Sequence, residues 1–261
     1  MASTDPPWLQ RPWRAWAPLW RDREAAEGRL FPWALLLIVG AISGGGYGLI
    51  VQVNAWRATT VWDPSTPWDF TIPVVPWSIL AYLSLYFYFP LALKSATRTD
   101  RGRFELILLH QGILILSLVS FAFFLAFPCE ILVTEQVPAE LIAGSDYPGP
   151  LFAAVRFFDR PYNAWPSLHI SLSFLMLLFL IRQWTRPLAV AALSASWILL
   201  ALSILTTKQH YIFDLASGLA LAIGVWHYSL GPALALASQH ATDAPEFAQR
   251  LLCPSEPSRS R

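Results

Sequence analysis

Charged residues are scarce in this chain of 261 residues, since Asp, Glu, Lys and Arg make up only 13% of it. Soluble globular chains carry about 25%, so the scarcity excludes an ordinary soluble enzyme and an intrinsically disordered chain. Neither sign is in excess, because 18 Lys and Arg stand against 17 Asp and Glu, and no nucleic-acid partner is indicated. Two cysteines are too few for a disulfide framework. With 55% hydrophobic residues, most of the chain is expected to be surrounded by lipid.

Long apolar runs are what the sequence has instead. A spanning helix needs about 20 mostly apolar residues, and six stretches come close to that length. They predict an all-α integral membrane protein with six transmembrane helices, over residues 31–53, 77–93, 104–127, 167–181, 188–205 and 211–230. The predicted organisation is an arm over 1–30, a six-helix domain over 31–238 and a disordered tail over 239–261.

The distribution of basic residues predicts the orientation of these helices, because Lys and Arg are retained on the cytoplasmic side of a membrane. Fourteen of the 18 basic residues lie in four segments. These segments are the arm, the loop between the second and third predicted helices, the loop between the fourth and fifth, and the tail. Only Arg57, Arg156, Arg160 and Lys208 are left for the opposite side. Both termini are therefore expected in the cytoplasm. No segment resembles a cleaved signal peptide, which fits a bacterial inner membrane.

The arm before the first span is rich in tryptophan and arginine, with Trp8, Trp13, Trp16 and Trp20 between the basic residues. We expect it to lie in the membrane interface, where indoles sit at headgroup depth and arginines meet phosphates. The alternative is a surface on which another protein docks.

Polar residues gather on the side opposite the termini, around His169 and His210. His169 opens the fourth helix and His210 precedes the sixth, 41 residues later. That separation is close to two spans at about 1.5 Å per residue. Both imidazoles therefore return to the same membrane surface, and the chain geometry permits them to meet.

The residues around the two histidines suit phosphoryl transfer. Asp214 follows His210 at i+4, on the same helix face, where a carboxylate fixes the imidazole tautomer and leaves the other nitrogen free to act as nucleophile or base. Ser167 stands at the start of a helix, whose free N–H groups attract anions. The predicted phosphate-binding residues are Ser167, Arg156, Arg160 and Lys208.

A metal site is the alternative reading of the same residues. Imidazole and carboxylate at i and i+4 can bind zinc, and His169 would complete a set of three protein ligands with His210 and Asp214. The neighbouring cations Arg160 and Lys208 would repel a divalent ion, so we expect neither a metal nor another cofactor.

Two motifs give the chain a family resemblance. Pro166-Ser167-Leu168-His169 and His210-x-x-x-Asp214, with Ser203 seven residues before that histidine, resemble two motifs of the type-2 phosphatidic acid phosphatase superfamily, P-S-G-H and S-R-x5-H-x3-D. Arg160-Pro161 is similar to the end of the family's first motif, K-x6-R-P. The departures are a Leu, an Ile and an Ala in place of the family's Gly, Arg and Lys, at Leu168, Ile204 and Ala153. The first two departures bring the chain nearer to inositol-phosphorylceramide synthases.

The resemblance implies a six-helix core with its active site on the non-cytoplasmic side. His210 would attack phosphorus to form a phosphohistidine, Asp214 would orient it, and His169 would serve as general acid and then as base. The expected activity is hydrolysis of a lipid phosphate or pyrophosphate. A phosphotransferase with an alcohol acceptor uses the same residues and stays open, as does a transporter or scaffold that has kept the fold without catalysis.

Overall fold

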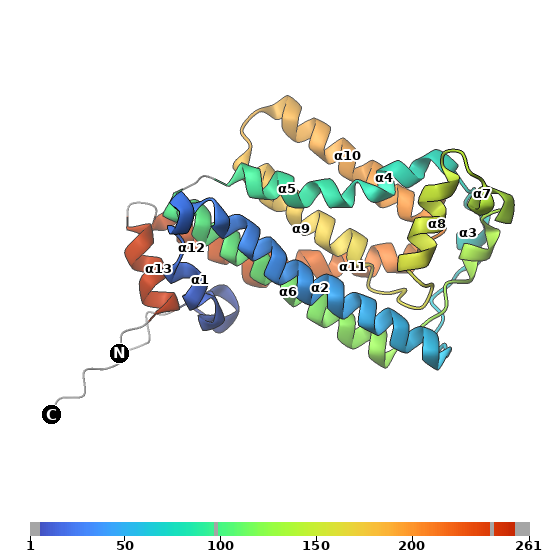
Figure 1. Cartoon of the computed structure of the whole chain (residues 1–261), viewed down its shortest axis with the longest axis horizontal. Coiled ribbons are helices and arrows are strands. Elements are labelled where there is room, and N and C mark those ends of the chain that lie inside the picture. The colour runs from blue at the N-terminus through green and yellow to red at the C-terminus, as the bar shows by residue number, and fades with distance from the viewer. Residues whose placement is uncertain (1–5, 97–98, 241–242, 254–261) are drawn as a thin grey trace.

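The computed structural model describes residues 6–96, 99–240 and 243–253, and within them the chain is helical with no β-strand. Long helices run side by side in a bundle, with short helices at both ends (Figure 1). The bundle consists of α2 (Leu30–Arg57), α4 (Ile79–Leu83), α5 (Leu85–Ser95), α6 (Asp100–Ala126), α9 (Leu168–Gln183), α10 (Pro187–Thr206), α11 (Ile212–Val225) and α12 (Gly231–Gln239). One end carries α1 (Ala17–Arg21) and α13 (Ala244–Leu252), and the other carries α3 (Pro67–Thr71), α7 (Ala139–Ala143) and α8 (Gly149–Phe158).

Short 3-10 and π segments complete the described chain. A 3-10 turn, η4 (Pro76–Ser78), leads into α4 and α5, and a π-helical turn, η6 (Trp226–Leu230), joins α11 to α12. The remaining 3-10 turns are η1 (Trp8–Gln10), η2 (Arg14–Trp16), η3 (Ala25–Gly28) and η5 (Leu132–Gln136).

Five helices of the described chain are long and apolar enough to cross a membrane: Leu30–Arg57, Pro76–Ser95, Asp100–Ala126, Pro187–Thr206 and Ile212–Gln239. They coincide with five of the six stretches that the sequence predicts as spans. The remaining stretch, 167–181, forms α9, which has 16 residues, or about 24 Å of helix. A lone helix of that length would be short for a bilayer, but α9 contacts α5, α6, α10 and α11 and has more than half of its residues buried.

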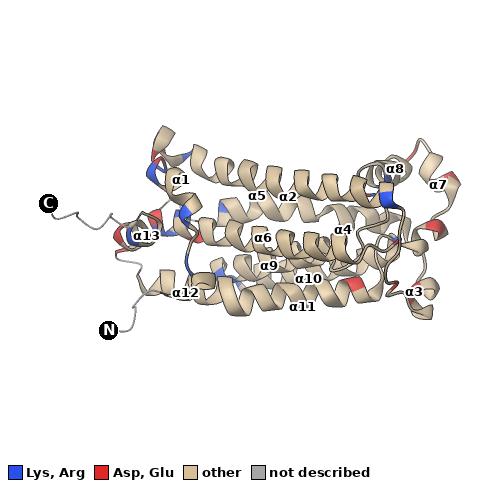
Figure 2. Cartoon of the chain, turned by 90° about the horizontal axis from the view of Figure 1, so that it is seen from below, with Lys and Arg blue, Asp and Glu red and all other residues tan. Residues whose placement is uncertain are grey.

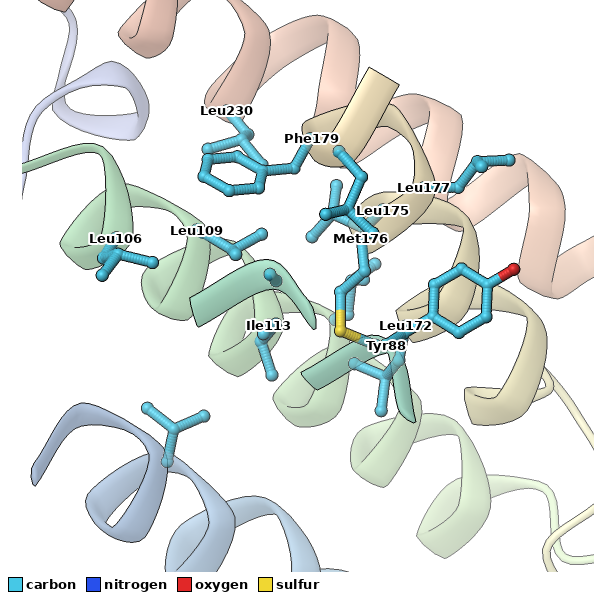
Figure 3. Packing of buried hydrophobic residues seen from close by; sticks show 14 of the residues in the cluster. Tyr88, Leu106, Leu109, Ile113, Leu172, Leu175, Met176, Leu177, Phe179 and Leu230 are labelled. Atoms are coloured by element: carbon cyan, nitrogen blue, oxygen red, sulfur yellow. The ribbon is translucent and has the colours of Figure 1, made fainter. Parts of the chain in front are cut away.

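The core lies between α9 and its neighbours. Figure 3 shows Leu172, Leu175 and Met176 of α9 close to Ile113 of α6 and Tyr88 of α5, and all five side chains are buried. The helix α9, with the shortest apolar run, sits at the centre of the bundle, where it is covered by other helices.

Basic residues gather at one end of the bundle, around α1, α12 and α13 (Figure 2). The helices α1 and α13 contact each other there. This arrangement agrees with the basic segments that the sequence assigns to one side of the membrane. Arg98, Arg259 and Arg261, which are part of that prediction, lie outside the described residues.

Two tryptophans of the N-terminal arm belong to the protein core, and the interfacial position of the arm stays a prediction. Trp16 and Trp20 are buried, and the Trp20 ring meets the edge of Phe104 on α6, with ring centres 6.1 Å apart. Trp8 remains exposed. The arm packs partly against its own helical bundle, because its indoles find apolar neighbours on α6 and α13 at this end.

The C-terminal tail is more ordered than the sequence predicts. Residues 244–252 form α13, in which Phe247, Ala248 and Leu252 are buried against the core. The prediction of disorder from residue 239 onward is therefore wrong for this segment, because its few apolar residues fall on one helical face. Residues 254–261 lie outside the described part of the chain.

Candidate active site

His169 and His210 come together at the end of the bundle that carries α3, α7 and α8. His169 is the second residue of α9, and His210 lies two residues before α11. Their ring centres are 6.3 Å apart and their ring planes are inclined by 57°. This geometry agrees with the expectation that the two imidazoles come together after the chain has crossed the bundle twice.

A close approach between α11 and the first turn of α9 sets this distance. The Ser167 backbone N–H donates to the Asp214 carbonyl oxygen at 3.2 Å. Gly218, one turn further along α11, makes the approach possible, since a Cβ there would lie 2.6 Å from the Ser167 carbonyl oxygen and 3.2 Å from its nitrogen. Only a residue without a side chain fits at this contact.

Hydrogen bonds fix the His210 ring on both sides. Its Nδ1 lies 3.1 Å from Asp214 Oδ2 and 3.1 Å from the Ala164 carbonyl oxygen, so Nδ1 carries the proton and donates to these two acceptors. Nε2 is then the unprotonated nitrogen, and it accepts a hydrogen bond from the Ser167 hydroxyl at 3.3 Å. Asp214 is buried and also accepts from the Tyr211 N–H at 2.8 Å, which fixes the carboxylate in turn.

His169 is held differently. Its ring stacks on Tyr82 of α4, with ring centres 4.1 Å apart and planes inclined by 24°. Its Nε2 is buried and has no hydrogen-bond partner among the described residues. The Tyr82 hydroxyl donates to Asp159 Oδ2 at 3.2 Å, and the Tyr47 hydroxyl donates to Asp159 Oδ1.

Asp159 is a second carboxyl group near the two histidines. Burial raises the pKa of this carboxyl, whereas the Tyr47 hydroxyl, the charge of His210 and the Tyr82 hydroxyl lower it. Because both of its oxygens accept a hydrogen bond, the hydroxyls favour the carboxylate form.

A cavity of about 420 Å³ joins the two histidines to the interior of the bundle. Its walls come from α2, α5, α6 and α9, and its surface is mostly apolar. Three of its lining residues, Gly40, Gly44 and Tyr86, are exposed, which indicates an opening on the side of α2 and α5. Among the described residues that line it, none is Lys or Arg.

The basic residues predicted to bind phosphate do not line this cavity. Lys208 is buried and its Nζ donates to the Asp69 carbonyl oxygen at 2.9 Å. Burial lowers the pKa of Lys208, and the Asp69 carboxylate raises it. Arg156 donates to the Thr134 carbonyl oxygen, and Arg160 is exposed. The structure thus brings Ser167 to the histidines but not these three cations, whose role in phosphate binding stays a prediction.

Asp69 ties the loop that carries His210 to α3. Its Oδ1 accepts from the Ile212 N–H at 2.7 Å, and its Oδ2 accepts from the N–H and the hydroxyl of Thr66, each at 2.7 Å. Together with the bond from Lys208, these contacts fix the residues on both sides of His210. The backbone of Lys208 has a φ of 61°, a left-handed conformation that directs its side chain toward α3.

The zinc alternative requires three side chains that converge on one ion. Within the described ranges, no group of three or more His, Cys, Asp or Glu side chains is arranged to hold a metal ion. The His210 Nδ1, which would face a metal shared with Asp214, is bonded to that carboxylate instead.

Sequence reasoning missed Tyr47, Tyr82, Asp159 and Gly218. Asp159 directly precedes the Arg160-Pro161 pair, which is the one signal that could have drawn attention to it. Nothing in the local sequence distinguishes Tyr47 or Tyr82 from the other aromatic residues of apolar helices. Their contribution depends on which helices become neighbours.

The Gly218 contact generates a prediction. Gly218→Ala should destabilise the protein by about 1–3 kcal/mol, because the new methyl group meets backbone atoms that cannot move aside without separating α11 from α9. Thermal unfolding in detergent measures this. Gly224→Ala on the same helix is the matched control, since a Cβ there meets nothing within 4 Å. Equal melting temperatures for the two variants would contradict the role of the contact.

Comparison with known proteins supports the resemblance seen in the motifs. The family model described as PAP2 superfamily, the type-2 phosphatidic acid phosphatases, matches residues 71–228. Searches of curated proteins and of solved structures find no match. The matched segment contains His169, His210, Asp214 and Ser167, and it covers more than half of the chain. The chain therefore belongs to the PAP2 superfamily.

Proposed function

We propose that the protein is a membrane lipid phosphatase that hydrolyses a lipid phosphate or pyrophosphate through a phosphohistidine, without a metal ion, on the non-cytoplasmic side of a cell membrane. The observation that carries the proposal is the pair of imidazoles on one cavity: His210, whose Nε2 is unprotonated and contacts only the Ser167 hydroxyl among the described residues, and His169, whose Nε2 has no partner in the described chain. Membership of the PAP2 superfamily supports activity on phosphate esters.

In the first half of the reaction, His210 Nε2 attacks phosphorus and a P–N bond forms. The bond between phosphorus and the oxygen of the lipid breaks, and that oxygen takes a proton from the protonated His169. The positive charge that develops on His210 is stabilised by Asp214 through the Nδ1–H bond at 3.1 Å. The lipid alcohol or the shortened phosphate leaves, and His169 is neutral.

In the second half, a water molecule attacks the phosphorus of the phosphohistidine. His169 now accepts a proton from this water, the P–N bond breaks, and its electron pair returns to His210 Nε2. Inorganic phosphate leaves and both histidines regain their starting protonation states. Each histidine thus serves both halves.

Phosphate binding is assigned to the start of α9 and to the Ser167 hydroxyl. The first N–H groups of a helix have no intrahelical acceptor and attract anions, and α9 begins at Leu168, next to both imidazoles. Arg156, Arg160 and Lys208 stay a prediction as phosphate-binding residues, because none of them lines the cavity.

A lipid substrate is supported by the cavity. Its lining is mostly apolar, it runs from His169 toward the middle of α2 and α6, and its exposed residues lie on helices long enough to span a membrane. The gathering of basic residues at the opposite end of the bundle supports a non-cytoplasmic site.

Replacement of either histidine tests the mechanism. His210→Ala and His169→Ala should each lower phosphate release from a lipid phosphate by about 10²-fold or more, because nucleophile and general acid are lost. Release of inorganic phosphate from phosphatidic acid in detergent is the measurement, with melting temperatures to establish folding. Full turnover by a folded variant would remove that histidine from the mechanism.

Obstruction of the cavity tests the lipid assignment. Gly44→Trp should lower turnover of a long-chain phosphate about tenfold while a short, water-soluble phosphate ester is affected much less, since the indole fills space that only a long chain needs. Gly45→Trp is the matched control, because Gly45 is equally open and exposed but does not line the cavity. Equal loss with both substrates would contradict a chain-binding cavity.

A phosphotransferase is the second candidate function. The cavity extends from the histidines to His110 on α6, which leaves room for the chain of a lipid alcohol that could accept the phosphoryl group in place of water. Product analysis separates the two: the phosphatase predicts free phosphate as the main product when inositol or diacylglycerol is added. A phosphate monoester of the added alcohol as the main product would establish the transferase, and no turnover with any lipid phosphate would favour a non-catalytic transporter or scaffold.

A further inference from the structure

The two histidines of the site are oriented by different forces. His210 has three polar neighbours within 3.3 Å, namely Asp214, Ala164 and Ser167. The His169 ring has no hydrogen bond within the described residues, and its only close ring contact besides His210 is the stack on Tyr82 at 4.1 Å. A general acid must present its proton in one direction, so the orientation of His169 depends on Tyr82.

Tyr82 is itself held in place. It is 2% exposed, and its hydroxyl donates to Asp159 Oδ2 at 3.2 Å. Asp159 ends α8, and its other oxygen accepts from Tyr47 of α2. Three elements that are distant in the sequence, α2, α4 and α8, therefore converge on one carboxylate behind the ring that supports His169.

The two histidines differ in how each is linked to a carboxyl group. Asp214 contacts His210 through a direct hydrogen bond of 3.1 Å. Asp159 is linked to His169 only through Tyr82, whose ring stacks on the imidazole and whose hydroxyl donates to Asp159.

We propose that Tyr82 and Asp159 are positioning residues for His169, forming with it a second imidazole–carboxylate unit that is connected through a tyrosine ring. The Asp159 carboxyl group fixes the Tyr82 hydroxyl, and the Tyr82 ring fixes the plane of the imidazole, so that His169 presents its proton in the direction of the leaving group. The inference rests on the proposed function, because it assigns a partner to the general acid of that reaction.

The leaving group of the substrate provides the test. An alkyl phosphate needs protonation of its oxygen as the P–O bond breaks, whereas p-nitrophenyl phosphate releases a stabilised phenolate that needs little protonation. Tyr82→Leu and Asp159→Asn should lower kcat/KM for a short alkyl phosphate on the order of 10²-fold, and far less for p-nitrophenyl phosphate. Tyr82→Phe, which keeps the ring and loses the hydroxyl, should show a smaller loss with the same preference.

Two controls make the result specific. Tyr88→Phe removes a buried tyrosine hydroxyl from α5, where it contacts the Leu193 carbonyl oxygen at 3.4 Å. This variant should leave kcat/KM unchanged for both substrates. His169→Ala should reproduce the leaving-group preference of Tyr82→Leu in a stronger form. If Tyr82→Leu or Asp159→Asn is too unstable to purify, Tyr82→Phe alone carries the comparison, because it keeps the aromatic ring and its packing.

The outcomes separate this inference from the proposed function. Turnover by the unmodified protein, with equal losses for both substrates in the Tyr82 and Asp159 variants, would overturn the positioning role and leave the phosphatase intact. Absence of turnover on every phosphate ester by the unmodified protein would overturn the proposed function, and the inference with it. A larger loss with the alkyl phosphate supports both.

Discussion

The contact between α11 and the first turn of α9 is the constraint on which the candidate site depends. The bond from the Ser167 N–H to the Asp214 carbonyl oxygen forms only because Gly218 has no side chain at the crossing. This contact sets the 6.3 Å separation of the histidine rings and places the Ser167 hydroxyl beside His210. A site that handles phosphorus tolerates little error in such distances, so a backbone contact is a suitable means of fixing them.

The two histidines are oriented by different kinds of contact, one mainly local in the sequence and the other formed between helices. His210 relies on Asp214, four residues away on the same chain segment. His169 relies on Tyr82 and Asp159, which come from other helices. The contact between His210 and Asp214 lies within one chain segment, at the start of α11. The contacts between His169, Tyr82 and Asp159 require several helices to pack together. The general acid of the proposed reaction therefore depends on tertiary structure more than the nucleophile does.

This difference also explains how much could be predicted from the sequence. Apolar runs and the spacing of His169, His210 and Asp214 were sufficient for the helical fold and for the convergence of the two rings. The direction of Lys208 could not be predicted, because it follows from a left-handed backbone and from Asp69, 139 residues earlier. The support from Tyr82 could not be predicted either, since an aromatic residue in an apolar helix carries no local sign of its neighbour. The disorder predicted for the tail is wrong over residues 244–252, because the few apolar residues of this segment pack against the helical bundle.

The short length of α9 has a consequence for the protein in its membrane. A helix that faces lipid must match the thickness of the hydrocarbon layer, by tilting or by distorting the bilayer. The helices α2 and α10 have large exposed apolar side chains, among them Leu37 and Leu188, and would respond first to a thicker or thinner bilayer. The helix α9 is enclosed by four neighbours and is insulated from that adjustment. The start of α9, where His169 lies, is thereby one step removed from the lipid, whereas the cavity wall that α2 provides is not.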